Sequence, residues 1–208
     1  MGRLRPARIR SDPGERTDGY HRGMWHDRME SERLILRPPT LADAPAIFAA
    51  YASDPEVTRY LTFRTHASAA ETRAYLKGCL RDRRAGRKFV WLLEEAGDGG
   101  LLGGISLRVQ GSEATLGYVV ARAFWGRGYA PEAVRRILDA TFSEQGIDRV
   151  SAICDVENPR SVRVLEKAGL RREGVLRGHI LHPNLSGEMR DVFRYSISRS
   201  SRRGRASS

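Results

Sequence analysis

Short apolar runs alternate with segments of helical periodicity between residues 30 and 197. Apolar runs bounded by turn residues are typical of buried strands, whereas apolar positions three and four residues apart are typical of helices. The runs predict strands at 34–37, 89–93, 101–109, 114–120, 149–154, 170–176 and 191–197. The periodic segments predict helices or helical turns at 40–48, 54–55, 67–83, 131–145 and 159–168. This order predicts an α/β (α+β) domain in which helices flank one sheet.

The predicted helices carry terminal signals and apolar faces. Thr40 precedes Asp43 by three residues, which is a variant of the capping box. Gly146 and Gly169 follow two helices, where glycine commonly ends a helix in the left-handed conformation. The apolar faces are predicted at Leu41, Ala44, Ile47 and Phe48, at Ala70, Ala74, Tyr75 and Leu80, and at Val134, Ile137, Leu138, Thr141 and Phe142.

The two ends of the chain lack such periodicity. Residues 1–28 are rich in Arg, Gly, Asp and Pro, and residues 198–208 contain only Arg, Ser, Gly and Ala. We expect both to be disordered arms around a domain at 29–197. They hold most of the formal net charge of +11, so a solvated basic arm is favoured over one that contacts nucleic acid.

Composition excludes several classes of protein. No apolar run approaches the roughly 18 residues that span a bilayer, and the N-terminus lacks the apolar core of a secretory signal. We therefore expect a cytoplasmic protein without a membrane partner. Cys79 and Cys154 are the only cysteines, and their spacing favours two reduced thiols over a disulfide or a metal site.

The segment 125–133 carries the first candidate chemistry. It joins a predicted strand to a predicted helix and contains Gly126 and Gly128. Glycine lets backbone amides approach a ligand, and a helix N-terminus attracts anions. Together these features make the segment an anion cradle suited to a pyrophosphate, and Arg127 could add positive charge. A plain connection is the alternative, and the spacing matches neither a dinucleotide nor an ATP loop.

A second candidate lies after the next strand. Asn158 stands immediately before Pro159, and Ser161 follows in the first turn of the predicted helix. Asn158 is well suited to be a simple N-cap. Ser161 could be an ordinary helix residue.

Four stretches, SERLILRPPTLADA (31–44), LGYVVARAFWGRGYAPEA (116–133), DRVSAICDVENPRSVRVLEKAGLRREG (148–174) and RDVFRYSI (190–197), occur in the order expected for one family. With them, residues 30–197 resemble the GNAT superfamily of N-acetyltransferases, in the branch of the RimJ and RimL ribosomal-protein acetyltransferases.

The resemblance implies a mixed, strongly bent sheet that splays open between its fourth and fifth strands, here 114–120 and 149–154. The pantetheine arm of acetyl-CoA would lie in that gap, against backbone groups of Val119 and Val120. The pyrophosphate would bind at 125–130, at Gly126 and the backbone groups of Arg127, Gly128, Tyr129 and Ala130. Trp125 replaces the usual Gln or Arg of this motif. Asn158 would bind the cofactor arm, and Ser161 would lie near the thioester sulfur. No metal is implied.

The resemblance also implies direct attack of an amine on the thioester, with Asn158 and Ser161 as the catalytic residues. Ser161 would protonate or hydrogen-bond the leaving thiolate. The base is unassigned, because Thr115 stands where the branch often has a Glu. Glu113 lies two residues earlier and could compensate if the register of the strand allows.

The acceptor is left open between a protein N-terminal α-amine and a small amine such as an antibiotic or a polyamine. A non-catalytic basic module that associates with ribosomes or nucleic acid is the alternative function. Homodimers are frequent among the relatives, so a homodimer is also an option.

Residues around the expected acceptor site are ambiguous. His179 and His182 lie in a predicted loop at 177–190, and we interpret them as surface histidines rather than pocket residues. Trp91 is expected in the core, and Tyr118 in either the core or a pocket wall. Tyr60 is interpreted as a packing residue.

Overall fold

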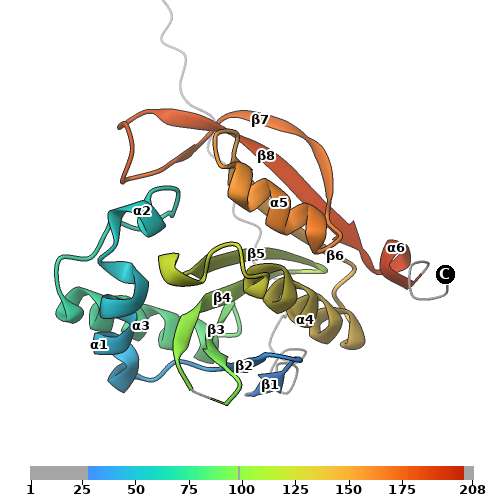
Figure 1. Cartoon of the computed structure of the whole chain (residues 1–208). Coiled ribbons are helices and arrows are strands. Elements are labelled where there is room, and N and C mark those ends of the chain that lie inside the picture. The colour runs from blue at the N-terminus through green and yellow to red at the C-terminus, as the bar shows by residue number, and fades with distance from the viewer. Residues whose placement is uncertain (1–27, 98, 204–208) are drawn as a thin grey trace, which may run out of the picture.

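The computed structural model describes residues 28–203 apart from residue 98, so the arm predicted at 1–28 lies almost wholly outside the described residues. The described chain forms one mixed sheet with the strand order β1-β2-β3-β4-β5-β6-β8-β7 (Figure 1). The strands are β1 (Met29–Glu30), β2 (Leu34–Arg37), β3 (Lys88–Glu95), β4 (Leu101–Gln110), β5 (Glu113–Val120), β6 (Arg149–Asp155), β7 (Arg171–Leu181) and β8 (Met189–Ser198). The predicted α/β class is confirmed.

Helices cover both faces of this sheet. They are η1 (Leu41–Asp43), α1 (Ala44–Ile47), η2 (Phe48–Ala52), α2 (Pro55–Thr58), α3 (Ala69–Arg84), η3 (Arg122–Phe124), α4 (Tyr129–Ser143), α5 (Pro159–Lys167) and α6 (Arg199–Arg203). One apolar cluster joins α4 and α5 to Leu116 and Val150 of the sheet. A second cluster joins α1, η2 and α3 to Leu92 and Val119. Trp91 is fully buried in the first cluster, as expected.

The sheet opens between its two parallel strands. β5 pairs with β6 only where Glu113, Ala114 and Thr115 face Arg149, Val150 and Ser151. Beyond Thr115 the strands diverge, although β5 remains paired with β4 up to Val120 and β6 with β8 up to Asp155. Two strand edges therefore face each other without a shared ladder, and the predicted splay is confirmed.

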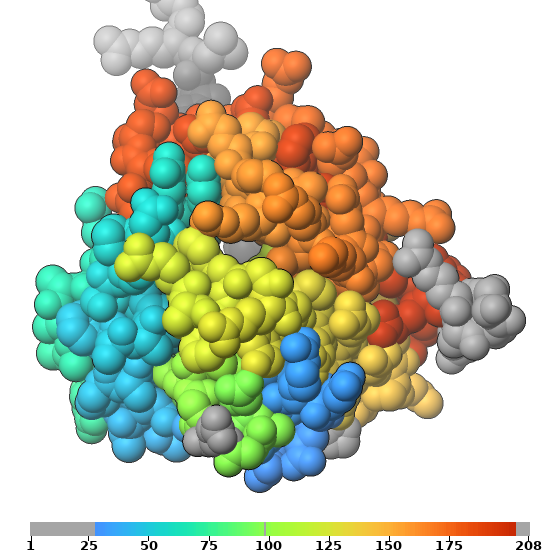
Figure 2. Space-filling model, in the orientation of Figure 1, coloured from blue at the N-terminus to red at the C-terminus, as the bar shows by residue number. Residues whose placement is uncertain are grey.

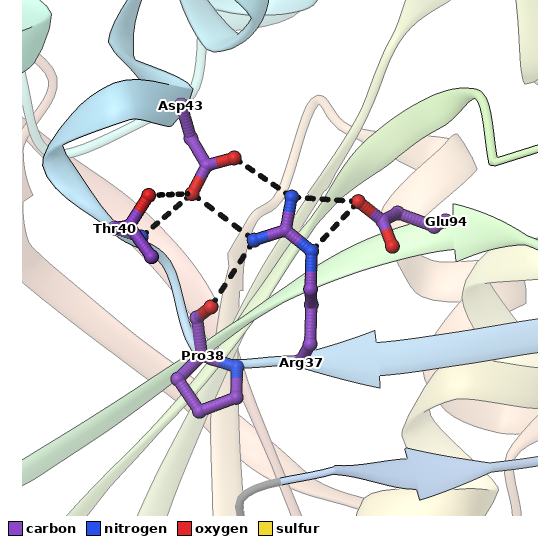
Figure 3. A network of polar contacts seen from close by, with 5 residues as sticks. All are labelled: Arg37, Pro38, Thr40, Asp43 and Glu94. Atoms are coloured by element: carbon purple, nitrogen blue, oxygen red, sulfur yellow. Dashed lines mark hydrogen bonds and ion pairs between the residues drawn. The ribbon is translucent and has the colours of Figure 1, made fainter.

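The first helical segment is anchored by the predicted cap. Asp43 Oδ2 accepts a hydrogen bond from the Thr40 N–H at 2.6 Å. The same carboxylate binds the Arg37 guanidinium, whose Nε donates to Glu94 Oε1 at 2.8 Å (Figure 3). Hydrogen bonding to Asp43, together with Glu94, raises the pKa of Arg37 despite its partial burial. Arg37 thus joins the end of β2 to β3 and, through Asp43, to the last residue of η1.

Three sequence predictions about the elements are wrong. The buried face of α3 is Thr72, Leu76 and Cys79 rather than Ala70, Ala74 and Leu80, because a polar threonine occupies one of its buried positions. β7 runs to Leu181, five residues beyond the prediction. It is an edge strand with almost every residue partly or fully exposed, so it shows no alternation of apolar and polar positions.

The third error concerns the C-terminal arm. The arm was expected from residue 198, but Arg199–Arg203 form α6. The Arg199 guanidinium donates to the carbonyls of Phe142, Glu144 and Ile147, the last at 2.6 Å. A cation that binds carbonyls at a helix C-terminus is stabilising. This contact depends on the end of α4 and therefore leaves no pattern in the local sequence.

Candidate active site

A cleft of about 1010 Å³ lies where β5 and β6 diverge. Figure 2 shows it as a hollow between the yellow segment that leads into α4 and the orange segment around α5. Of the residues predicted for the site, those that line it are Val119, Val120, Gly126, Gly128, Tyr129, Ala130, Asn158 and Ser161. Arg127 does not line it; its guanidinium lies 5.5 Å from the ring centroid of Phe124.

The glycine loop delivers a helix N-terminus to this cleft. Gly126 and Gly128 have φ angles of 79° and 85°, which residues other than glycine rarely adopt. Gly128 is the N-cap of α4 and has no side chain to cap the first turn. The first N–H groups of a helix have no intrahelical acceptor, so the loop presents donors and positive potential to an anion.

The edge of β5 offers backbone groups to the gap. Ala121 N–H donates to Leu102 O of β4 at 2.8 Å. Backbone groups alternate in direction along an antiparallel strand, so those of Val119 also point toward β4. The groups that face the gap belong to Tyr118 and Val120. This corrects the prediction for Val119, whose contribution to the cleft is its side chain.

One of these backbone groups, the carbonyl of Val120, already accepts a hydrogen bond from a side chain of the same chain. The indole Nε1 of Trp125 donates to Val120 O at 2.7 Å. The Trp125 ring is in turn covered by the Arg160 guanidinium at 4.2 Å from its centroid. Trp125 therefore fixes the entrance to the glycine loop from within the chain.

Polar side chains meet at the start of α5. Asn158 Oδ1 accepts from Ser161 N–H at 3.1 Å, so Asn158 is an N-cap as well as a cleft residue. The hydroxyls of Ser161 and Tyr118 lie 2.8 Å apart. Burial raises the pKa of Tyr118, and burial likewise raises the pKa of the neighbouring Cys154 thiol to about 11. At neutral pH this corner of the cleft therefore presents neutral O–H and S–H groups.

Two loops close the other end of the cleft. The Asn184 side chain accepts from Thr65 N–H at 2.8 Å and donates to the carbonyls of Thr58 at 2.8 Å and Phe63 at 2.7 Å. The Tyr60 hydroxyl donates to Glu157 O at 3.1 Å. These contacts join the α2–α3 connection to the β7–β8 loop and to the start of α5. Asn184 and Tyr60 gave no distinguishing signal in the sequence, because their partners are backbone groups distant in the chain.

The interpretation of His182 as a surface residue is wrong. Its side chain is only 4% exposed, and its Nε2 lies 3.4 Å from Asp155 Oδ2. Burial lowers the pKa of His182, although Asp155 opposes this, so the ring is neutral at pH 7. Burial also raises the pKa of Asp155, but hydrogen bonds from Arg190 and from Glu157 N–H outweigh it, and the net shift is downward. His179 is exposed, as expected.

The structure shows whether Glu113 of β5 can act as the general base in place of a Glu at position 115. Thr115 lines the cleft, whereas Glu113 is exposed and does not. Glu113 pairs with Arg149 where β5 and β6 still form a ladder. It lies five residues from Tyr118, which is roughly 16 Å along a strand. Glu113 therefore does not compensate for the missing Glu at position 115.

The hydrogen bonds that hold the glycine loop and the first turn of α4 to the N-terminal segment were not predicted from the sequence. Glu132 in the first turn of α4 accepts from the Ser31 hydroxyl at 2.8 Å, from Arg33 N–H at 2.9 Å and from Arg33 Nε at 2.8 Å. Arg33 also donates from Nη1 to Arg127 O at 3.1 Å. The N-terminal segment thus holds both the loop and the helix that follows it. A Ser-x-Arg preceding the first long strand is a weak signal by itself.

Within residues 28–203, residue 98 excepted, no group of three or more His, Cys, Asp or Glu is placed to hold a metal ion. In the same part of the chain, no helix has the length and apolar character needed to cross a membrane.

Comparison with known proteins agrees with the architecture. The model of the acetyltransferase (GNAT) domain family matches residues 33–171. YoaA of Bacillus subtilis (strain 168), named as an uncharacterized N-acetyltransferase, is 32% identical over 172 residues, which cover 81% of this chain and 95% of YoaA.

Two solved structures of the expected branch are similar. Mycobacterium smegmatis RimJ, in complex with CoA-disulfide, is 25% identical, with a TM-score of 0.71 over 84% of this chain and 89% of RimJ. RimL, a ribosomal L7/L12 α-N-protein acetyltransferase in complex with coenzyme A, is 20% identical, with a TM-score of 0.74 over 82% of this chain and 97% of RimL. The predicted RimJ/RimL resemblance is confirmed, and the chain belongs to the GNAT family of N-acetyltransferases.

Proposed function

We propose that the protein transfers the acetyl group of acetyl-CoA to a primary amine, and that this amine is the N-terminal α-amine of a protein. One observation carries the proposal: the unpaired edge of β5 leads into a glycine loop that ends at a helix N-terminus. An extended arm could lie along the edge while its pyrophosphate binds the loop. RimL, an α-N-protein acetyltransferase bound to coenzyme A, supports both the cofactor and the type of acceptor, and RimJ, bound to CoA-disulfide, supports the cofactor.

The residues of the cleft fit such a cofactor. The N–H groups of the first turn of α4, beginning at Tyr129 and Ala130, would hold the phosphates. Backbone groups of Tyr118 and Val120 would align the arm, and the Asn158 amide nitrogen, which makes no hydrogen bond to a described residue, would donate to it. When bound, acetyl-CoA supplies an acetyl thioester already activated for attack.

The chain's own groups would then assist transfer. A backbone N–H at the gap would stabilise negative charge on the carbonyl oxygen as the amine attacks. The paired hydroxyls of Tyr118 and Ser161 would donate a hydrogen bond to the departing sulfur, since burial keeps Tyr118 protonated. The amine would react from its free-base fraction and release its proton to water at the open end of the cleft.

Calorimetric titration of acetyl-CoA and of CoA into the full chain tests the cofactor site. We expect micromolar binding of both. Gly128→Asp should abolish binding, because it places a carboxylate at the expected pyrophosphate and a Cβ 3.3 Å from Arg33 Nη2. Gly111→Asp is the matched control, since Gly111 has a φ of 59° and no atom within 4 Å of its Cβ position. Equal binding by the two variants would refute the assignment of the loop.

Release of free CoA thiol tests the acceptor. Peptides with ribosomal-protein N-termini should be acetylated in preference to polyamines and aminoglycosides. Transfer to the small amines alone would indicate that the acceptor is a small amine rather than a protein N-terminus. Cofactor binding without transfer to any amine would leave a binding module on this fold.

A further inference from the structure

Two cations that line the cleft form no ion pair with a carboxylate of the described residues. Lys88 on β3 and Arg108 on β4 are directly opposite in the strand register, and both line the cleft. Neither side chain forms an ion pair or hydrogen bond with a described residue; Lys88 Nζ lies 5.7 Å from the ring centroid of Tyr75. Arg108 interacts electrostatically with Asp82, but the ion pair of that carboxylate is with Arg87, at 2.7 Å. Like charges directly opposite on a sheet are destabilising, so this pair is suited to an added anion.

These cations lie on the face of the sheet away from α4. Side chains alternate between the two faces of a strand, and residues opposite in register share a face. Arg108 is opposite Thr115, which shares its face with Val119 of the cluster around α1 and α3. Leu116 and Tyr118 pack instead with the cluster that includes α4 and α5. Lys88 and Arg108 are therefore across the sheet from the glycine loop.

The cofactor phosphates have other cations available. Arg160, Arg163 and Lys167 line the cleft from α5 at spacings of three and four residues, which place them on one side of that helix. Arg160 covers Trp125 at the entrance to the glycine loop. Because these groups lie on the α4 side, the pair on the far face is left for a different ligand.

The floor between the reacting centre and the cation pair consists of small residues. Gly117 and Ser106 are opposite in register and line the cleft. A Cβ at Gly117 would lie 3.3 Å from Ser106 Oγ, so even a methyl group would narrow the floor. Thr115, opposite Arg108, is three residues from Tyr118, roughly 10 Å along the strand. An extended peptide covers that distance in about three residues.

We propose that Lys88 and Arg108 bind a negatively charged side chain of the acceptor, near the third residue of its N-terminal segment. The inference rests on the proposed function and narrows it to acceptor proteins that begin with an acidic segment. The amine would lie at the gap beside Tyr118 and the acidic group over the cation pair. The two strands would thus select the acceptor by charge at a position removed from the chemistry.

Three hexapeptides test this, each beginning Ser-Ala, ending in three alanines and carrying Glu, Gln or Lys at position three. Initial rates of CoA release at saturating acetyl-CoA give kcat/KM for each. We expect the Glu peptide to exceed the Gln peptide by about tenfold, as for one charge-assisted contact in a partly exposed site. The Lys peptide should be poorer still. Equal values for the three peptides, or a preference for Lys, would overturn the proposal.

Variants of Lys88 and Arg108 test whether these two residues cause the preference for the Glu peptide. Lys88→Gln/Arg108→Gln should abolish the preference, and Lys88→Glu/Arg108→Glu should reverse it in favour of the Lys peptide. Lys77→Glu/Arg81→Glu changes the net charge equally on exposed positions of α3 outside the cleft, and should keep the wild-type order. An unchanged preference in the Gln variant would overturn the assignment of these residues.

The outcome separates the two proposals. If acetyl-CoA binds the wild type and none of the three peptides is acetylated, the acidic acceptor is refuted and the cofactor site stands. If acetyl-CoA does not bind, the proposed function fails first. The Gln variant should bind acetyl-CoA as the wild type does, because its changes lie across the sheet from the glycine loop.

Discussion

Gly103→Ala should force β4 and β5 apart at the end of β5 that leads into the glycine loop. A Cβ on Gly103 would lie 2.1 Å from Val119 O and 3.0 Å from both Val119 C and Val120 Cα. All three are backbone atoms of β5, so no side chain can rotate away. Strands β4 and β5 must separate by about 1 Å to bring the shortest contact from 2.1 Å to 3.0 Å.

The loss of folding free energy caused by this clash can be worked out from the geometry. Overpacking in a core costs about 1–3 kcal/mol, and a clash with rigid backbone belongs at the upper end. For a chain of this size, about 3 kcal/mol lowers Tm by roughly 6–12 °C. Acetyl-CoA affinity should fall as well, because the displaced segment ends at Val120, whose backbone faces the gap. Differential scanning calorimetry and acetyl-CoA titration measure the two effects.

Gly104→Ala is the matched control. Its Cβ would lie 3.4 Å from the Tyr51 hydroxyl and 3.5 Å from Trp91 O, close to ordinary contacts. Both substitutions remove the same backbone freedom from the unfolded chain, so the difference between the two variants isolates the clash. Tm values within 2 °C of each other would refute the argument that the β4 and β5 backbones are in contact at Gly103.

Three further predictions concern the walls of the cleft. Asn184→Ala should lower the free energy of unfolding in urea by about 2 kcal/mol and raise the KM of the acceptor without weakening acetyl-CoA binding; an unchanged KM would contradict the role of this side chain at the acceptor end. In a Cys79→Ala background, alkylation of Cys154 by iodoacetamide should accelerate about tenfold per pH unit from pH 7 to 10, because its pKa is about 11; a plateau near pH 8.5 would indicate an ordinary thiol. The pKa of His182 is lower in the folded than in the unfolded chain, so the folded state binds fewer protons, and stability present above about pH 6.5 is lost as pH falls. His182→Gln should therefore lose less stability than wild type between pH 7.5 and 5.5, and an equal loss would show that this histidine does not titrate on unfolding.

The sequence predicted those elements that are stabilised by contacts between residues close together in the chain. The buried face of α4 was predicted because Val134, Ile137 and Leu138 recur at helical spacing. The splay at β5 and β6 could be expected only from the resemblance, because no local pattern distinguishes a strand paired over three residues from one paired throughout. The capping box at Thr40 was readable, but the Arg37 network around it was not, since Glu94 is distant in the chain.

Within the candidate site, residue identity was more predictable than the direction of backbone groups. Asn158 and Ser161 have fixed places relative to Pro159, but only the resemblance assigned them to the site, since the local pattern favoured an N-cap and an ordinary helix residue. Val119 and Val120 could not be distinguished, because which of them faces β4 depends on the hydrogen-bond register, here set by Ala121. His182 was misjudged for a similar reason: its burial depends on residues distant in the chain, such as Asp155 of β6 and Tyr60.

The connectivity explains why this cleft can serve charged ligands. β5 and β6 are parallel, so their carboxyl ends lie at the same edge of the sheet, and each leads into the N-terminus of a helix, α4 and α5. Ligands of open α/β sheets bind at the carboxyl ends of the strands. The divergence beyond Thr115 sets these two helix N-termini on either side of one gap, where their positive ends act together. A change that restored pairing beyond Thr115 would remove the gap without altering any side chain in the glycine loop, so the loop sequence alone does not specify the site.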